Sequence, residues 1–117
     1  MTIETIVAAP ATRFRAVRCA NLELRPSEPL ALAEGRPVDL TAREFQLLLA
    51  LAERRGRVVP RHELYEQVWR RRMAYRDRAV DVFVRKLRLK LAQAAPGWVY
   101  IHTHFGVGYR LAPQRLI

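Results

Sequence analysis

Basic and aliphatic side chains are interspersed between Arg78 and Leu91 at a spacing that a helix would separate onto two faces. At about 100° per residue, one face of such a helix carries only aliphatic residues, which suit a core. They are Val80, Val84, Leu87 and Leu91. The opposite face carries Arg78, Val82, Arg85, Lys86 and Leu89. Cationic groups beside apolar side chains suit a helix that lies in a DNA groove, although an amphipathic surface helix shows the same pattern.

The composition also favours an anionic partner. The 117 residues carry a formal net charge of +10, from 21 Lys and Arg against 11 Asp and Glu. Thirteen of the 21 basic residues lie between Arg54 and Lys90, so the positive field is concentrated on one part of the chain. Such a balance is typical of proteins that bind nucleic acid. The length and the 50% hydrophobic content predict one domain with a single core.

Other features bear on the compartment. A single cysteine, Cys19, excludes an internal disulfide and fits a reducing interior. No apolar run approaches the roughly 18 residues of a membrane-spanning helix, and the first residues lack the pattern of an export signal. We therefore expect a cytoplasmic protein without a membrane partner.

The N-terminal third is expected to form a sheet. Residues 1–12 are interpreted as a tail or linker remnant, and the domain is expected to occupy residues 13–117. From residue 13 to residue 40, apolar residues recur with period two between turn-forming residues, which predicts four short antiparallel strands. The apolar pairs are Leu22 and Leu24, Leu30 and Leu32, and Val38 and Leu40. Residues 34–36 are a plausible hairpin turn.

Three helices and a hairpin are expected to follow. Thr41 and Glu44 have the spacing of a capping box, and Gly56 is placed to end this first helix in a left-handed conformation. A second helix is expected over residues 61–69, without a side-chain cap because Pro60 precedes it. After the third helix, residues 98–104 and 109–113 read as strands around a Gly-containing turn. This order predicts an α+β fold, a winged helix-turn-helix whose third helix enters the major groove.

Four linked motifs carry a family resemblance: LTAREFQLLLAL, GRVVPRHELYEQVW, RAVDVFVRKLRLKL and GVGYRL. In this order and spacing they resemble the OmpR/PhoB-type effector domain of bacterial two-component response regulators, over roughly residues 17–111. The resemblance implies a regulator of transcription that binds double-stranded DNA sequence-specifically. It also implies that two copies bind direct repeats as a head-to-tail pair.

The resemblance assigns DNA contacts to the third helix at Arg78, Arg85, Lys86 and Arg88. Chemically, Arg85 and Lys86 can donate to guanine O6 and N7, and Val82 can meet a thymine methyl group. Arg78 and Arg88 are better placed for phosphates at the groove edges. Lys86 is a point charge where relatives often have a forked arginine, so we expect looser base selectivity there.

Further contacts are implied outside the third helix. Arg61 and Trp69 match family positions that hold the sugar-phosphate backbone, and Thr103 matches a contact in the wing. The Tyr109 hydroxyl could reach a phosphate from a ring that packs inside. For Trp69 the alternative is a core aromatic, and for Thr103 it is an ordinary strand residue.

Two positions depart from the family pattern. Phe105 stands where relatives often have an arginine that enters the minor groove, and a phenyl ring cannot exploit the negative potential of that groove. It could contact sugars or wedge weakly at a base step, but packing on the hairpin is the simpler expectation. Leu89 stands where relatives often have a basic residue, and it could meet a thymine methyl group or a neighbouring protomer.

The family also suggests protein partners. Arg70, Arg71 and Arg72 precede a loop that in the family can contact RNA polymerase, especially its sigma subunit, although arginines there could equally bind phosphate. Relatives carry an N-terminal receiver domain with the phosphorylated aspartate, and only 40 residues precede the first expected helix here. We therefore expect an excised effector domain or a stand-alone regulator. A sensor kinase is a partner only if a receiver domain lies upstream.

Rival functions have less support. His102 and His104 share a strand face and could chelate a metal with His62, but the chain has no HExxH motif or cysteine pair. We therefore expect no enzymatic activity and no cofactor. A winged-helix module for protein or RNA is the remaining alternative, because a cationic face does not distinguish duplex DNA from structured RNA.

Overall fold

The computed structural model of the chain describes residues 15–116, so the tail or linker expected over residues 1–12 lies outside them. The first four strands form one antiparallel sheet in chain order, as predicted. They are β1 (Val17–Cys19), β2 (Leu22–Arg25), β3 (Leu30–Ala33) and β4 (Arg36–Val38). Glu34 and Gly35 both have positive φ and connect β3 to β4, so the expected hairpin turn is confirmed.

The buried face of β3 differs from its most apolar face. Leu30 and Leu32 located the strand, but Ala31 and Ala33 are the residues buried there. The antiparallel register explains this, because Ala33 pairs with Leu22 and Ala31 pairs with Leu24. Paired residues share a face, so the side that buries the leucines of β2 must bury the alanines of β3.

Helix α3 (Ala42–Glu53) begins with the predicted capping box. The Glu44 backbone N–H donates to Thr41 Oγ1, and the Thr41 N–H donates to the Glu44 carboxylate at 2.9 Å. Glu44 is buried, and Lys90 Nζ lies 2.7 Å from the same carboxylate. Gly56 is left-handed at φ 81°, but it lies beyond the helix end at Arg54. Its N–H donates to the Leu111 carbonyl, so Gly56 bonds the loop after α3 to β7 and does not cap the helix.

The remaining helices and strands form the winged part of the fold. They are β5 (Val58–Pro60), α4 (Arg61–Trp69), α5 (Ala79–Ala94), β6 (Trp98–His104) and β7 (Gly108–Arg115). Strand β5 was not predicted; it pairs with β7 and extends the expected hairpin into a three-stranded sheet. In the described part of the chain no side chain caps α4, as expected after Pro60. Its first N–H donates to the carbonyl of Val107 in the wing turn.

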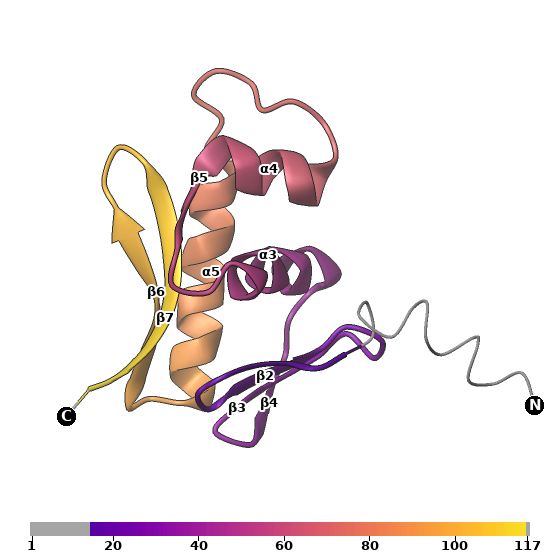
Figure 1. Cartoon of the computed structure of the whole chain (residues 1–117), viewed down its shortest axis with the longest axis vertical. Coiled ribbons are helices and arrows are strands. Elements are labelled where there is room, and N and C mark those ends of the chain that lie inside the picture. Colours follow the sequence, from indigo (N-terminus) through magenta and orange to yellow (C-terminus); the bar gives the residue numbers. More distant parts are fainter. Residues whose placement is uncertain (1–14, 117) are drawn as a thin grey trace, which may run out of the picture.

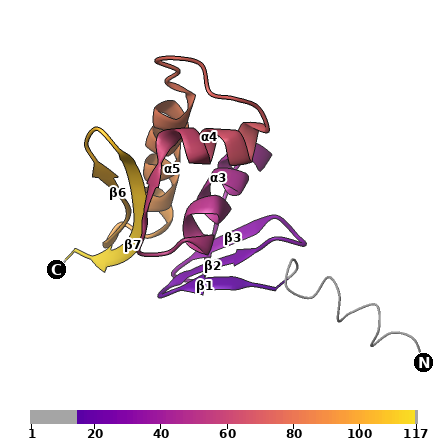
Figure 2. The ribbon, with the colours of Figure 1, turned by 45° about the horizontal axis from the view of Figure 1, so that its top comes forward.

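Helix α5 lies at the centre of the arrangement (Figure 1). The β6–β7 hairpin stands along one side of it, α3 and α4 pack on the other, and the four-stranded sheet lies near its C-terminal end (Figures 1 and 2). The predicted inner face of α5 is confirmed, because Val80, Val84, Leu87 and Leu91 are all buried. Within residues 15–116, no helix is both long and apolar enough to cross a membrane.

One glycine sets how closely the sheet of the wing can pack. A Cβ atom added at Gly108 would lie 2.0 Å from the Val59 carbonyl oxygen, which is far inside van der Waals contact. We predict that Gly108→Ala lowers the free energy of unfolding by roughly 2–3 kcal/mol, because β5 must move away from β7. Urea denaturation measures the change.

Gly97→Ala is the matched control, because no atom of residues 15–116 lies within 4 Å of a Cβ atom at that glycine. We expect it to change stability by less than about 0.5 kcal/mol. Equal denaturation midpoints for the two variants would contradict the role given to Gly108.

Candidate nucleic-acid interface

The outer face of α5 is exposed, as the helical spacing predicted. Arg78, Arg85 and Lys86 are exposed, and so are the apolar side chains of Val82 (46%) and Leu89 (61%). An aliphatic side chain left in water contributes nothing to the core. This face is therefore a cationic surface with apolar patches, free for a ligand.

Arg85 and Lys86 are the cations on this face with the fewest partners inside the protein. Among residues 15–116, neither forms a salt bridge, and Arg85 makes no side-chain hydrogen bond. Lys86 is exposed, and its Nζ lies 5.1 Å from the centre of the Phe83 ring in a cation–π contact. Both side chains are therefore available to an external anion or acceptor.

Asp81 connects three elements through one carboxylate. Its Oδ1 accepts from Arg61 Nε of α4 at 2.7 Å and from the Tyr109 hydroxyl of β7. Its Oδ2 accepts from Arg78 Nε at 3.2 Å, just before α5 begins. The Arg61 guanidinium also lies over the Tyr109 ring, 4.9 Å from its centre. The start of α4, the start of α5 and the wing are thus held at one point.

This environment favours the ionised carboxylate. Burial alone would raise the pKa of Asp81, but the hydrogen bonds from Tyr109 and Arg61 and the charges of Arg61 and Arg78 outweigh it. The net effect lowers the pKa of Asp81 below its ordinary value. Burial and the bond to Asp81 raise the pKa of Tyr109, so its hydroxyl remains a donor.

Arg88 and Thr103, both predicted to contact DNA, contact each other. Arg88 Nη2 donates to Thr103 Oγ1 at 2.6 Å and to the Ile101 carbonyl at 3.0 Å. The Arg88 guanidinium also lies 5.6 Å from the centre of the Tyr109 ring. Arg88 is half-buried and fastens β6 to α5, so in the free protein it positions the wing.

Trp69 belongs to an aromatic cluster at the end of α4. Its ring stacks on Tyr65 at 4.9 Å between centres and meets Phe83 edge-on at 5.2 Å. The Arg43 guanidinium covers it at 5.0 Å. The Trp69 side chain is partly buried and packs against the core. The rest of its ring is accessible, so Trp69 can both pack and offer a ring edge to a ligand.

Phe105 does not pack on the hairpin, and that expectation is wrong. The side chain is 91% exposed at the turn between β6 and β7. The reason is the turn itself: the Val107 N–H donates to the His104 carbonyl at 2.9 Å, and Gly106 is left-handed at φ 79°. A residue at the second position of such a turn projects away from both strands.

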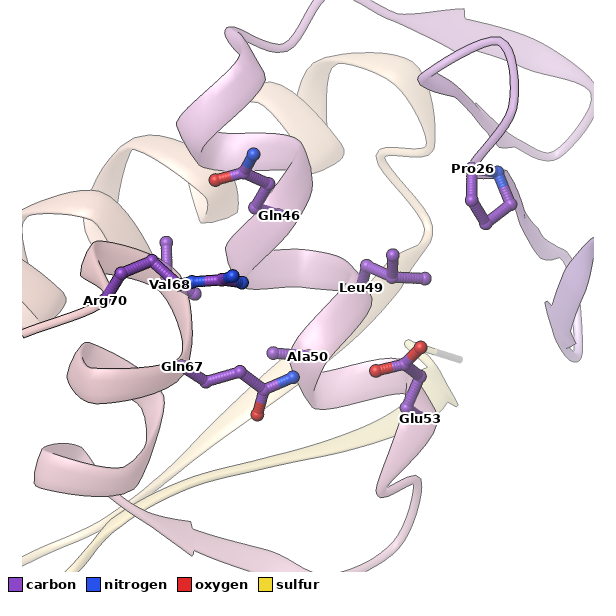
Figure 3. Close-up of a pocket in the computed structure, with 8 residues that line it drawn as sticks. All are labelled: Pro26, Gln46, Leu49, Ala50, Glu53, Gln67, Val68 and Arg70. Carbon is purple, nitrogen blue, oxygen red and sulfur yellow. The ribbon is translucent and has the colours of Figure 1, made fainter. Parts of the chain in front are cut away.

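The three arginines after α4 have different surroundings. Arg70 is left-handed at φ 62° and lines a groove of about 660 Å³ between α3, α4 and the turn at Pro26 (Figure 3). Arg71 Nε donates to the Tyr65 hydroxyl at 2.9 Å, and Arg72 is exposed. The groove has polar walls that include Gln46 and Gln67 (Figure 3).

The histidines have ordinary partners. His102 Nε2 lies 2.8 Å from the Ala112 carbonyl, and His104 Nε2 accepts from Arg110 Nε at 3.0 Å. His62 is exposed on α4. In the part of the chain that the structure describes, no three His, Cys, Asp or Glu residues are grouped so that they could hold a metal ion.

Asp81 is the residue of this site that the sequence did not reveal. Its partners Arg61 and Tyr109 lie 20 and 28 positions away, so spacing along a helix cannot find them. The available signal was an acidic residue in the first turn of a basic helix, a position that also favours a carboxylate through the helix dipole.

Residues 35–111 match the family model described as "Transcriptional regulatory protein, C terminal". The chain belongs to the OmpR/PhoB family. It is 38% identical over 88 residues to the transcriptional regulatory protein CpxR of Klebsiella pneumoniae, covering 75% of this chain and 38% of that protein. It is 45% identical over 84 residues to PrrA of Mycobacterium tuberculosis, covering 72% and 36%.

A solved structure of this family shows the same fold. The DNA-binding domain of Klebsiella pneumoniae RstA, in complex with the RstA box, superposes with a TM-score of 0.75 at 28% identity. The match covers 84% of this chain and 97% of that one. The chain thus spans well under half the length of these two curated relatives, and nearly the whole length of the RstA DNA-binding domain.

The Asp81 junction predicts a dependence of stability on pH. Because the pKa of Asp81 is lower in the folded state, its contribution is full above the unfolded pKa of about 3.9 and is lost as the pH falls through the folded value. We predict that Asp81→Asn loses about 2 kcal/mol of unfolding free energy at pH 7. The difference from the wild type should shrink toward pH 3 in urea denaturation.

Asp39→Asn serves as the control, because Asp39 is exposed and forms no salt bridge among the described residues. It should leave stability at pH 7 nearly unchanged. A loss in Asp81→Asn that stays constant between pH 7 and pH 3 would show that the charge of Asp81 does not stabilise the junction.

Proposed function

We propose that this chain is the effector domain of a transcription regulator and binds double-stranded DNA sequence-specifically. Helix α5 would lie in the major groove, and the β6–β7 wing would lie on the flanking minor groove or backbone. The observation that carries the proposal is the pair Arg85 and Lys86. Both are exposed and form no salt bridge with the described residues, on a helix whose other face is buried in the core. Family membership and the DNA complex of the RstA domain support it.

The contacts within the protein divide the cations into two groups. We propose that Arg85 and Lys86 read base edges, with Val82 and Leu89 against thymine methyl groups. Three arginines hold the frame and bring positive charge to the phosphates at its edges. They are Arg61, Arg78 and Arg88.

Three more residues border this interface, and their contacts within the protein limit how each can bind DNA. The Tyr109 hydroxyl donates its proton to Asp81, and the Arg61 guanidinium lies over the Tyr109 ring. We therefore propose that Tyr109 positions Arg61 for a phosphate contact. We propose that Thr103 and the edge of Trp69 lie against the sugar-phosphate backbone. Thr103 Oγ1 already accepts from Arg88, which leaves its own hydroxyl proton free to donate to a phosphate.

The assembly on DNA is also a proposal. We propose that two copies bind direct repeats head-to-tail, and that the arginines after α4 contact RNA polymerase, especially its sigma subunit. Exposed Arg72 and the polar groove beside Arg70 support a protein contact there. A duplex ligand would place this activity in the cytoplasm. Any control by a sensor kinase would act through a receiver domain of a longer protein.

Charge-dependent binding is the first test. With a fluorescent random-sequence duplex, we predict that log Kobs falls linearly with log salt concentration, because several phosphates are neutralised. On a duplex recovered by selection, Arg85→Ala should weaken binding by roughly 5- to 100-fold at fixed salt. Anisotropy titrations measure both effects.

Arg36→Ala provides the matched loss of one charge. Arg36 begins β4, and among residues 15–116 its side chain makes one hydrogen bond, to the Ala94 carbonyl. It should bind nearly as the wild type does. Binding that is flat between low and moderate salt, or equal losses in both variants, would contradict the proposed surface. Tighter binding to a structured RNA hairpin would favour the RNA-module alternative.

Sequence selectivity is the second test. Selection from a randomised duplex pool should recover one motif repeated in direct orientation, because head-to-tail copies present the same face. Sequencing of the enriched pool gives the motif and the spacing. An inverted repeat would contradict head-to-tail assembly, and no enrichment would contradict sequence-specific binding.

A further inference from the structure

The tip of the wing presents a large apolar ring to water. Phe105 is 91% exposed, and its neighbour Val107 is 50% exposed. Burial of a phenyl ring is strongly favourable, so a ring held in solvent without a partner is an available binding element. The family arginine that this position replaces would be attracted by phosphates, whereas a ring gains only by leaving water.

The ring stands on a rigid support. The turn is closed by the Val107 N–H and the His104 carbonyl, and the Val107 carbonyl accepts from the Arg61 N–H at 3.2 Å. Immediately after it, Gly108 packs against the backbone of Val59. Little backbone entropy therefore remains to be lost when the ring enters a binding site.

The support also fixes where the ring lies relative to α5. Arg88 fastens Thr103 and Ile101 of β6 to the helix, and the Tyr109 hydroxyl fastens β7 to Asp81. The wing therefore moves with the helix. In the proposed complex, with α5 in the major groove, the wing tip would lie at the adjacent minor groove.

We propose that Phe105 is a specificity-determining wedge that inserts its ring from the minor groove into a base step and partly unstacks it. This inference rests on the proposed function. An apolar wedge pays the cost of unstacking, so it favours the steps that unstack most easily, which are the pyrimidine–purine steps TA and CA/TG. The selectivity differs in kind from that of an arginine, which reads the narrow groove of a stiff A-tract.

Parallel selections from a randomised duplex pool test the wedge. The wild type should recover the α5 motif together with a pyrimidine–purine step at one fixed distance from it. Phe105→Ala should keep the motif but lose the step preference, with about tenfold weaker binding to the wild-type consensus. Phe105→Leu, which keeps an apolar side chain, should retain part of the preference.

Tyr75→Ala is the control, because Tyr75 is another aromatic side chain, 87% exposed, in the connection between α4 and α5. It should keep both the motif and the step. As a direct signature, 2-aminopurine placed at the step should brighten on binding of the wild type and not of Phe105→Ala, because unstacking relieves its quenching.

The outcomes separate the two claims. A motif without a preferred step, or equal 2-aminopurine signals for the wild type and Phe105→Ala, overturns the wedge and leaves the proposed function intact. No motif for the wild type overturns both. If Phe105→Ala weakens only cooperative binding to two half-sites, the ring contacts a neighbouring copy and the wedge is wrong.

Discussion

One carboxylate, that of Asp81, determines how the DNA-facing parts of this domain are oriented. It accepts hydrogen bonds from Arg61 of α4, from Arg78 before α5 and from Tyr109 of the wing. Arg61 and Tyr109 belong to other elements than Asp81, so the carboxylate ties α4 and the wing to the start of α5. A negative charge inside a cationic surface weakens the attraction for phosphate. The geometry that it fixes makes selective contacts possible.

The contacts of Asp81 and Arg88 show that the basic residues of the chain are not equivalent. The net charge of +10 predicted an anionic ligand but did not distinguish the individual cations. Arg61, Arg78 and Arg88 are engaged in contacts that orient helices and wing, whereas Arg85 and Lys86 form no salt bridge within residues 15–116. We propose that sequence readout rests on Arg85 and Lys86, on a frame that the other three arginines hold together.

Local patterns made most of the fold predictable. The capping box at Thr41 and the two faces of α5 depend on residues within a few positions of one another, and both are confirmed. Strand β5 is too short to show a period, and it is recognisable only through its pairing with β7. The buried face of β3 follows from the register, and the partners of Asp81 follow from tertiary packing. The exposure of Phe105 depends on turn geometry that composition does not encode.

Chemical-shift mapping of the isotope-labelled chain with a duplex recovered by selection tests the central claim most directly. Signals of the Arg85 guanidinium, the backbone of α5 residues 82–89 and the wing turn at residues 104–107 should shift together on binding. Signals of the four-stranded sheet, β1 to β4, should remain in place for a single bound copy. Perturbations centred on that sheet, or on the groove that Gln46 and Gln67 line, would contradict the account.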